Sequence, residues 1–130
     1  MKIIKNMELQ LVEFYAAKML KKHGFSEMCE WAYDARNAKL IFHKKKENHN
    51  KDHNKISAPT QALVCKWLRD RHNIFISIMF ELDTWELYID NGINKGSFSP
   101  EEASYDSFEE AEKVGIQQGI KILNLKLQKL

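Results

Sequence analysis

The feature that most constrains the fold is a central stretch in which apolar residues occupy every second position. One alternating run extends from Ile74 to Phe80 and a second from Trp85 to Ile89. Alternation with a period of two is typical of a β-strand with one buried face. Two such runs joined by a short break indicate a β-hairpin. A register that pairs Leu82 with Trp85 gathers the apolar side chains of both strands on one face.

A second hairpin is expected earlier, in the stretch CEWAYDARNAKLIFH that begins at residue 29. If Arg36 and Asn37 form a two-residue loop, Tyr33 lies opposite Leu40 and the large apolar groups share one face. A slip of one residue would mix the two faces. The pattern therefore predicts this register.

The first helix is expected to extend from Met7 to His23, where apolar residues recur at helical spacing. Gly24 follows at the position where a left-handed residue often ends a helix. Phe25 can then close over Leu20, as the Schellman arrangement requires.

Two further helices follow. The second is expected to begin near Thr60, which can serve as its N-cap, and to end at His72. The third begins after Ser107, whose hydroxyl can cap the first turn. Gly115 and Gly119 lie four residues apart in this helix and allow a sheet or another helix to approach closely.

The order of elements is thus helix, hairpin, helix, hairpin, helix. The simplest assembly is an α+β fold, a four-stranded antiparallel sheet with helices mainly on one face. The 130 residues favour a single domain over 1–130. The range 44–55 contains no apolar residue and cannot offset its ordering entropy by burial. We expect it to form a mobile polar loop.

The charge balance limits binding to polyanions. With 20 basic and 18 acidic residues, the net charge is +2, which is too small to draw the whole protein onto nucleic acid. The lysines of the polar loop could still contact phosphates locally. They lack the interleaved aromatics of a stacking surface, which makes nucleic-acid binding the weaker alternative. The candidates are Lys44, Lys45, Lys46, Lys51 and Lys55.

No catalytic residue, metal or cofactor is expected. The sequence has no glycine-rich phosphate loop, no nucleophile elbow and no zinc-protease motif. The polar run from Arg69 to His72 ends the second helix, where cations complement the helix dipole. His43, His49 and His53 are expected to be solvated, because a polar loop loses entropy when it assembles metal ligands.

Cysteine use and hydropathy indicate a cytoplasmic protein. Cys29 and Cys65 are too far apart for a metal ribbon or a C-x-x-C pair, and two isolated thiols suit a reducing compartment. The start, MKIIKNMELQ, lacks the apolar core of a signal peptide, and no run approaches ~18 apolar residues. We therefore expect no contact with membranes.

The strongest functional signal is an apolar strip on the outer face of the central hairpin. Phe75, Met79 and Tyr88 fall on the side opposite to the expected core. An exposed apolar patch often marks an interface. The alternative is that the first helix or the range 91–106 folds over the strip. We expect a homo-oligomer or a protein partner, and hence a non-enzymatic protein-interaction or self-associating module.

Three stretches carry a resemblance to a known family. They are APTQALVCKWLRDRHNIFISI, KHGFSEMCEWAYD and YDSFEEAEKVGIQQGIKIL. Together they are similar to a family of small uncharacterised proteins found in phages and prophages of gut bacteria. The range 44–55 departs from this family in its richness in His, Asn and Lys. The resemblance implies a mobile-element origin and a bacterial cytoplasm, and it transfers no functional residues.

Overall fold

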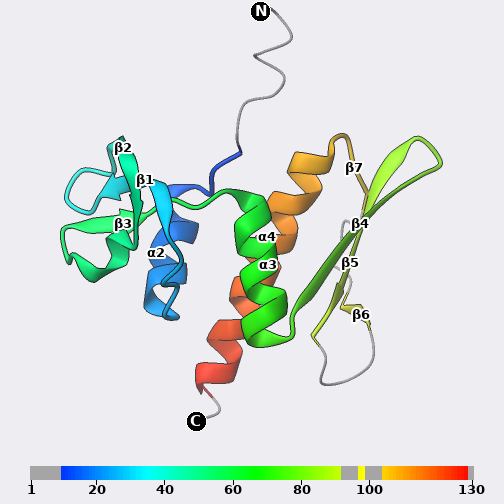
Figure 1. Ribbon diagram of the computed structural model, residues 1–130. Coiled ribbons are helices and arrows are strands. Elements are labelled where there is room, and N and C mark those ends of the chain that lie inside the picture. The colour runs from blue at the N-terminus through cyan, green and yellow to red at the C-terminus, as the bar shows by residue number, and fades with distance from the viewer. Residues whose placement is uncertain (1–9, 92–96, 99–103, 129–130) are drawn as a thin grey trace, which may run out of the picture.

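The computed structural model describes residues 10–91, 97–98 and 104–128 of the chain. Its elements in chain order are α2 (Phe14–Lys22), β1 (Cys29–Asp34), β2 (Leu40–Glu47), the 3-10 helix η1 (His49–Lys51), β3 (Lys55–Ser57), α3 (Gln61–His72), β4 (Phe75–Glu81), β5 (Thr84–Asp90), β6 (Ser97–Phe98), β7 (Ser104–Tyr105) and α4 (Phe108–Gln128) (Figure 1). All strand pairs are antiparallel. The α+β class predicted from the sequence is confirmed.

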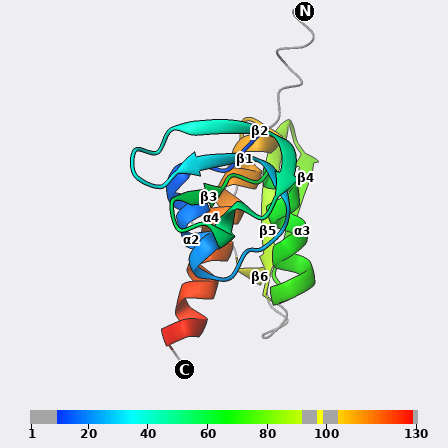
Figure 2. The same cartoon turned by 60° about the vertical axis from the view of Figure 1, so that its left-hand side comes forward.

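The strands form two separate sheets, so the prediction of one four-stranded sheet was wrong. The first sheet has the order β2-β1-β3, and in Figure 2 these strands lie side by side. The second sheet has the order β4-β5-β6, and β7 also pairs with β5. The helices lie between the sheets: α2 contacts β3, and α4 contacts β4 and β5 (Figure 1). Alternation gives each hairpin a buried face but does not determine which hairpins are neighbours.

The range 44–55, predicted as one polar loop, consists largely of regular structure. Its start belongs to β2, its middle forms η1, and Lys55 begins β3. The His49 side chain is only 3% exposed, and its Nε2 lies 2.8 Å from the carbonyl oxygen of Cys29. Polar side chains can be buried where hydrogen bonds satisfy them. Apolar content alone therefore does not predict this packing.

Asn50 connects the range 44–55 to neighbouring segments through two side-chain hydrogen bonds. Its side-chain amide donates to the carbonyl oxygen of Phe25 at 2.9 Å. Its side-chain oxygen accepts from the backbone N–H of Ser57 at 2.8 Å. One carboxamide thus joins the chain after α2 to strand β3.

The first hairpin has the predicted register over most of its length. Tyr33 pairs with Leu40, and Trp31 pairs with Phe42. A bulge then shifts the register, so that Cys29 pairs with Glu47. Farther from the turn, the predicted alignment is therefore lost.

Helix α2 begins at Phe14, later than the predicted start at Met7. Residues 7–9 lie outside the described residues, and Leu11 forms an extended bridge to Thr60 instead. The backbone N–H of Val12 also donates to the carbonyl oxygen of Pro59 at 3.0 Å. Pairing of residues 11–12 with the segment that leads into α3 therefore replaces the helical structure expected at those positions.

The helix ends follow the local sequence signals. Gly24 adopts a φ of 87°, as predicted for the residue that ends α2. The Thr60 hydroxyl accepts from the N–H of Leu63 at 3.2 Å and caps α3. The Ser107 hydroxyl accepts from the N–H of Glu110 at 3.1 Å and caps α4. These three predictions are confirmed.

In the second hairpin the side chains lie on their predicted faces, but the register of the two strands differs from the prediction. Its turn is formed by Leu82 and Asp83, with φ values of 49° and 65°. Trp85 therefore pairs with Phe80 rather than with Leu82. The error is two residues, which is the period of the strand, so the side chains stay on their predicted faces.

The two helical glycines position α4 closely against its neighbours. A Cβ atom at Gly115 would lie 2.8 Å from Cγ2 of Ile76 in β4. A Cβ atom at Gly119 would lie 3.0 Å from Cδ1 of Leu68 in α3. The predicted close approach is confirmed for both positions. Leu87 on β5 is fully buried beneath this contact.

No helix among residues 10–91, 97–98 and 104–128 has the length and apolar character needed to cross a membrane.

Candidate functional site

The predicted apolar strip is exposed on the second sheet. The exposed fractions of the side chains are 39% for Phe75, 50% for Met79 and 37% for Tyr88. The corrected register places Tyr88 opposite Ser77 and Met79 opposite Glu86. Met79 and Tyr88 are therefore diagonal neighbours, rather than directly opposed as the sequence pattern suggested.

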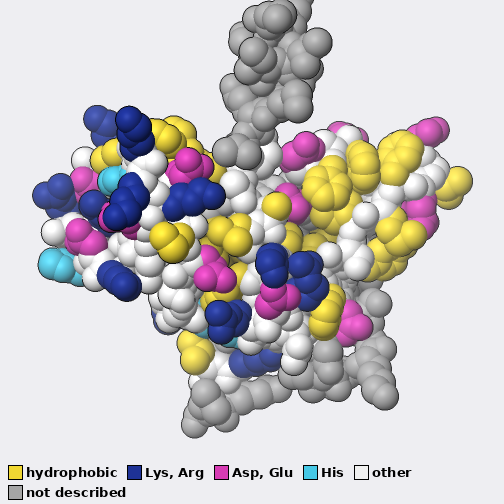
Figure 3. Space-filling model, viewed as in Figure 1, with side chains coloured by type: hydrophobic (Ala, Val, Ile, Leu, Met, Phe, Trp, Pro, Cys, Tyr) yellow, Lys and Arg dark blue, Asp and Glu magenta, His cyan; other side chains and the backbone are white. Residues whose placement is uncertain are grey.

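A second group of exposed apolar side chains lies at the tip of the β4–β5 hairpin, which projects beyond the helices in Figure 1. Phe80 is 58% exposed and Leu82 is 96% exposed. The ring of Phe80 packs at a tilt on Trp85 with centroids 5.0 Å apart, and Trp85 meets Phe108 edge to face at 5.6 Å. Figure 3 shows hydrophobic side chains gathered over this hairpin. The period-two pattern assigned Phe80 to the core, but at the tip the helices no longer cover that face.

Strand β4 is an edge strand. It pairs with β5 on one side, and no strand among the described residues pairs with its other side. Its only charged residue is Glu81 at the end next to the turn. The edge strand β2 differs, because it contains three consecutive lysines, Lys44, Lys45 and Lys46. Lysines on an edge oppose pairing with another chain, and β4 lacks this protection.

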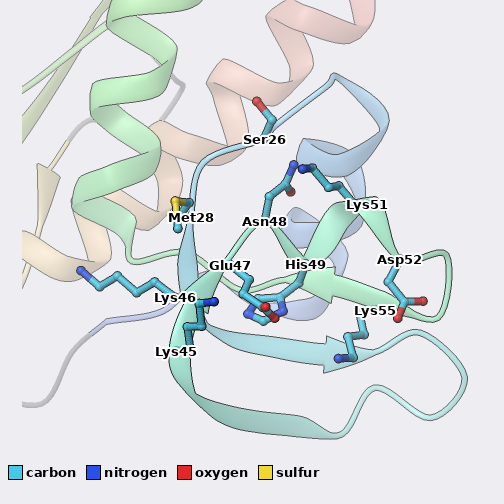
Figure 4. Close-up of a pocket in the computed structure, with 10 residues that line it drawn as sticks. All are labelled: Ser26, Met28, Lys45, Lys46, Glu47, Asn48, His49, Lys51, Asp52 and Lys55. Atoms are coloured by element: carbon cyan, nitrogen blue, oxygen red, sulfur yellow. The ribbon is translucent and has the colours of Figure 1, made fainter.

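The lysines of the range 44–55 surround a hollow of about 750 Å³ on the other side of the molecule (Figure 4). Four of the five predicted nucleic-acid contacts line it, and Lys44 does not. Glu47 and Asp52 also line the hollow and offset part of its positive charge. The lining residues are Ser26, Met28, Lys45, Lys46, Glu47, Asn48, His49, Lys51, Asp52 and Lys55.

The histidines of this region are arranged by packing. The rings of His43 and His49 stack with centroids 4.3 Å apart, whereas His53 is exposed. Burial lowers the pKa of His49, and the neighbouring His43 lowers it further. His49, predicted to be solvated, is therefore part of the interior. No group of three or more His, Cys, Asp or Glu residues in the described part of the chain could hold a metal ion.

Both thiols are poor nucleophiles at neutral pH. Burial raises the pKa of Cys29 to about 11. Burial also raises the pKa of Cys65 to about 12, and the nearby carboxylate of Glu112 adds to the effect. A thiol with a raised pKa is protonated and unreactive near pH 7.

The polar run at the end of α3 is occupied by local contacts. The Lys66 ammonium donates to the carboxylate of Asp70 one turn later, and the Arg69 guanidinium lies 3.7 Å from the same carboxylate. The His72 ring packs edge to face on Trp67 with ring centroids 4.6 Å apart. The prediction that these residues form the end of a helix agrees with this geometry.

Two histidines make stability depend on pH. Burial lowers the pKa of His49 and of His72, so the unfolded chain binds protons more readily than the folded protein just below pH ~6.5. Stability is thus fully present above that pH and falls as the pH decreases below it. The lowered pKa values of Asp34 and Asp70 matter only below about pH 4.

We expect the melting temperature to be several degrees lower at pH 5 than at pH 7.5. His49→Gln should reduce this difference, because glutamine keeps an N–H donor for the Cys29 carbonyl but does not titrate. The matched control is His53→Gln at an exposed position, which should leave the difference unchanged. Thermal unfolding followed by circular dichroism measures both, and a higher melting temperature at pH 5 would contradict the assignment.

Comparisons of the chain with protein-family models, with curated proteins and with solved structures found no significant match. The resemblance to a phage and prophage family therefore stays a prediction.

Proposed function

We propose that the protein is a non-enzymatic module that self-associates through its β4–β5 hairpin. The observation that carries the proposal is the exposed strip of Phe75, Met79 and Tyr88 on an antiparallel sheet. The exposed face of such a sheet is usually polar, and an apolar patch on it more often marks an interface. The exposed Phe80 and Leu82 extend the apolar surface to the tip of the same hairpin.

The chemistry of the interior supports a non-enzymatic role. The two thiols have pKa values raised by burial, and the carboxylate of Glu112 beside Cys65 raises the pKa of that thiol further. The carboxylate of Asp70 near the end of α3 accepts a hydrogen bond from Lys66 on the same helix. These groups contribute to packing and to the helix end. The exposed apolar surface of the hairpin has no such structural role, and binding to another chain would explain it.

Phe75→Asp tests the proposal. We expect the wild-type chain to sediment as a dimer and Phe75→Asp to weaken association about tenfold or more, because the substitution places a charge in the contact. Tyr88→Asp in the same strip reports how far the contact extends across the sheet. Lys121→Asp, at an exposed position on α4, is the control. A mass of one chain at every concentration would contradict self-association.

A second candidate is the accessory binding of nucleic acid by the lysines around the hollow, favoured because Lys45, Lys46, Lys51 and Lys55 all line it. Phosphate contacts weaken steeply as salt increases. A salt titration against generic single- and double-stranded DNA therefore tests it, with the double variant Lys45→Glu and Lys46→Glu as the loss-of-binding control. Binding that does not change with salt, or no binding at low salt, would exclude this role.

A further inference from the structure

We propose that two copies of the chain pair through the outer edges of β4, antiparallel about a two-fold axis at Ile78, and so join their second sheets into one. This inference rests on the proposed self-association and places its contact along the β4 edge, beside the strip of Phe75, Met79 and Tyr88 rather than over it. The outer edge of β4 pairs with no strand among the described residues, and the inward-facing side chains of Ile76 and Ile78 remain partly exposed. Their partners on β5, Ile89 and Leu87, are fully buried.

The hairpin turn determines which backbone groups face the free edge. With Leu82 and Asp83 in the turn, Glu81 and Thr84 form the hydrogen-bonded pair that closes the hairpin. Hydrogen-bonded and non-hydrogen-bonded pairs then alternate along the ladder. The backbone N–H and C=O groups of Ile76, Ile78 and Phe80 therefore point away from β5, toward the outer edge.

These three residues are self-complementary across a two-fold axis at Ile78. Each Ile78 meets its copy, and each Ile76 meets the Phe80 of the other chain. Three hydrogen-bonded pairs of this kind give about six hydrogen bonds between the chains. The contact also covers Phe80, which is 58% exposed in the single chain. A register shifted by two residues would bring the turn or the end of α3 into the ladder and lose pairs.

The charges agree with the same register. It places Asp83 at the turn of one chain near Asn73, which ends α3 in the other. Arg71 and His72 precede Asn73, so the acidic turn of each chain approaches the basic helix end of its copy. The edge strand β2 of the first sheet would instead bring its lysines together. The charges therefore favour the β4 edge over the β2 edge for pairing with a second copy.

Paired variants test the edge contact directly. Phe80→Pro removes an outward N–H without removing a bond to β5, and Phe80→Ala removes the side chain but keeps that N–H. Two hydrogen bonds are lost per dimer, so Phe80→Pro should weaken association about tenfold to a hundredfold more than Phe80→Ala. Sedimentation equilibrium of the full chain measures this, and circular dichroism confirms that both variants fold.

A charge exchange tests the register independently. Asp83→Arg and Arg71→Asp should each weaken association, because each brings like charges together twice in the dimer. An equimolar mixture of the two variants should restore the dimer, because both contacts then join opposite charges.

The outcomes separate this inference from the proposed function. Edge pairing is supported if Phe80→Pro loses association and the mixture of charge variants restores it. Tyr88→Asp should then weaken association less than about threefold, since Tyr88 lies one strand from the contact. Association that resists Phe80→Pro but is lost in Tyr88→Asp overturns edge pairing and leaves self-association intact. A wild-type chain that stays monomeric overturns both.

Discussion

Replacing Trp67 by alanine is expected to lower the free energy of unfolding by ~3 to 5 kcal/mol. The Trp67 side chain is 4% exposed on α3. Its ring packs on Phe25, which follows α2, with centroids 5.3 Å apart. It also packs on His72 in the last turn of its own helix. The substitution therefore opens a cavity between α3 and the segment that follows α2, and the shift of one side chain cannot fill it.

Urea unfolding followed by circular dichroism measures the loss without relying on tryptophan fluorescence. The matched control is Trp85→Ala, because Trp85 lies near the exposed hairpin tip and is only half-buried. We expect Trp85→Ala to cost less than half as much as Trp67→Ala. A cost below ~1 kcal/mol for Trp67→Ala would mean that Trp67 does not anchor the core.

Replacing Gly115 by valine is expected to destabilise the protein by ~2 to 3 kcal/mol. Even the first carbon atom of a side chain at this position would lie 2.8 Å from Ile76 and 3.1 Å from Leu87. Both neighbours lie on the inner face of the second sheet, and the branched Ile76 has few rotamers available to it. Helix α4 would have to move away from β4 and β5.

The control for this substitution is Lys121→Val on the exposed side of α4. Lys121→Val lowers helix propensity by less than ~0.7 kcal/mol and makes no new contact, whereas Gly115→Val slightly raises helix propensity. A larger cost for Gly115→Val in chemical denaturation therefore reflects packing and not helix propensity. Equal costs would contradict the close approach of α4 to the sheet.

Short-range features of the fold could be predicted from the sequence because their causes are local. The left-handed Gly24 ends α2, and the hydroxyls of Thr60 and Ser107 cap α3 and α4. Each of these signals acts within about one helical turn. Strand faces were predictable for a similar reason, since the side-chain alternation does not depend on the rest of the fold.

Long-range features could not be predicted in this way. The register of the second hairpin depends on a turn at Leu82 and Asp83, and leucine rarely adopts the positive φ seen there. The third strand of the first sheet, β3, follows a polar range in which His49 and Asn50 are held by hydrogen bonds to distant residues. Neither apolar periodicity nor composition contains that information.

The candidate site also combines local features that could be predicted from the sequence with long-range features that could not. The strip of Phe75, Met79 and Tyr88 followed from alternation, and all three side chains are exposed. The accessible edge of β4 did not follow, because strand order is a property of the whole sheet. The exposure of Phe80 also depends on how far the helices extend along the hairpin.

Hydrogen exchange of the β4 amides at increasing protein concentration tests the proposed self-association most directly. The N–H groups of Ser77 and Met79 bond to β5 in each chain and should be protected at every concentration. The N–H groups of Ile76, Ile78 and Phe80 should exchange rapidly in dilute solution and become protected as the dimer forms. Rapid exchange of these three amides at every concentration would contradict edge pairing between copies of this chain.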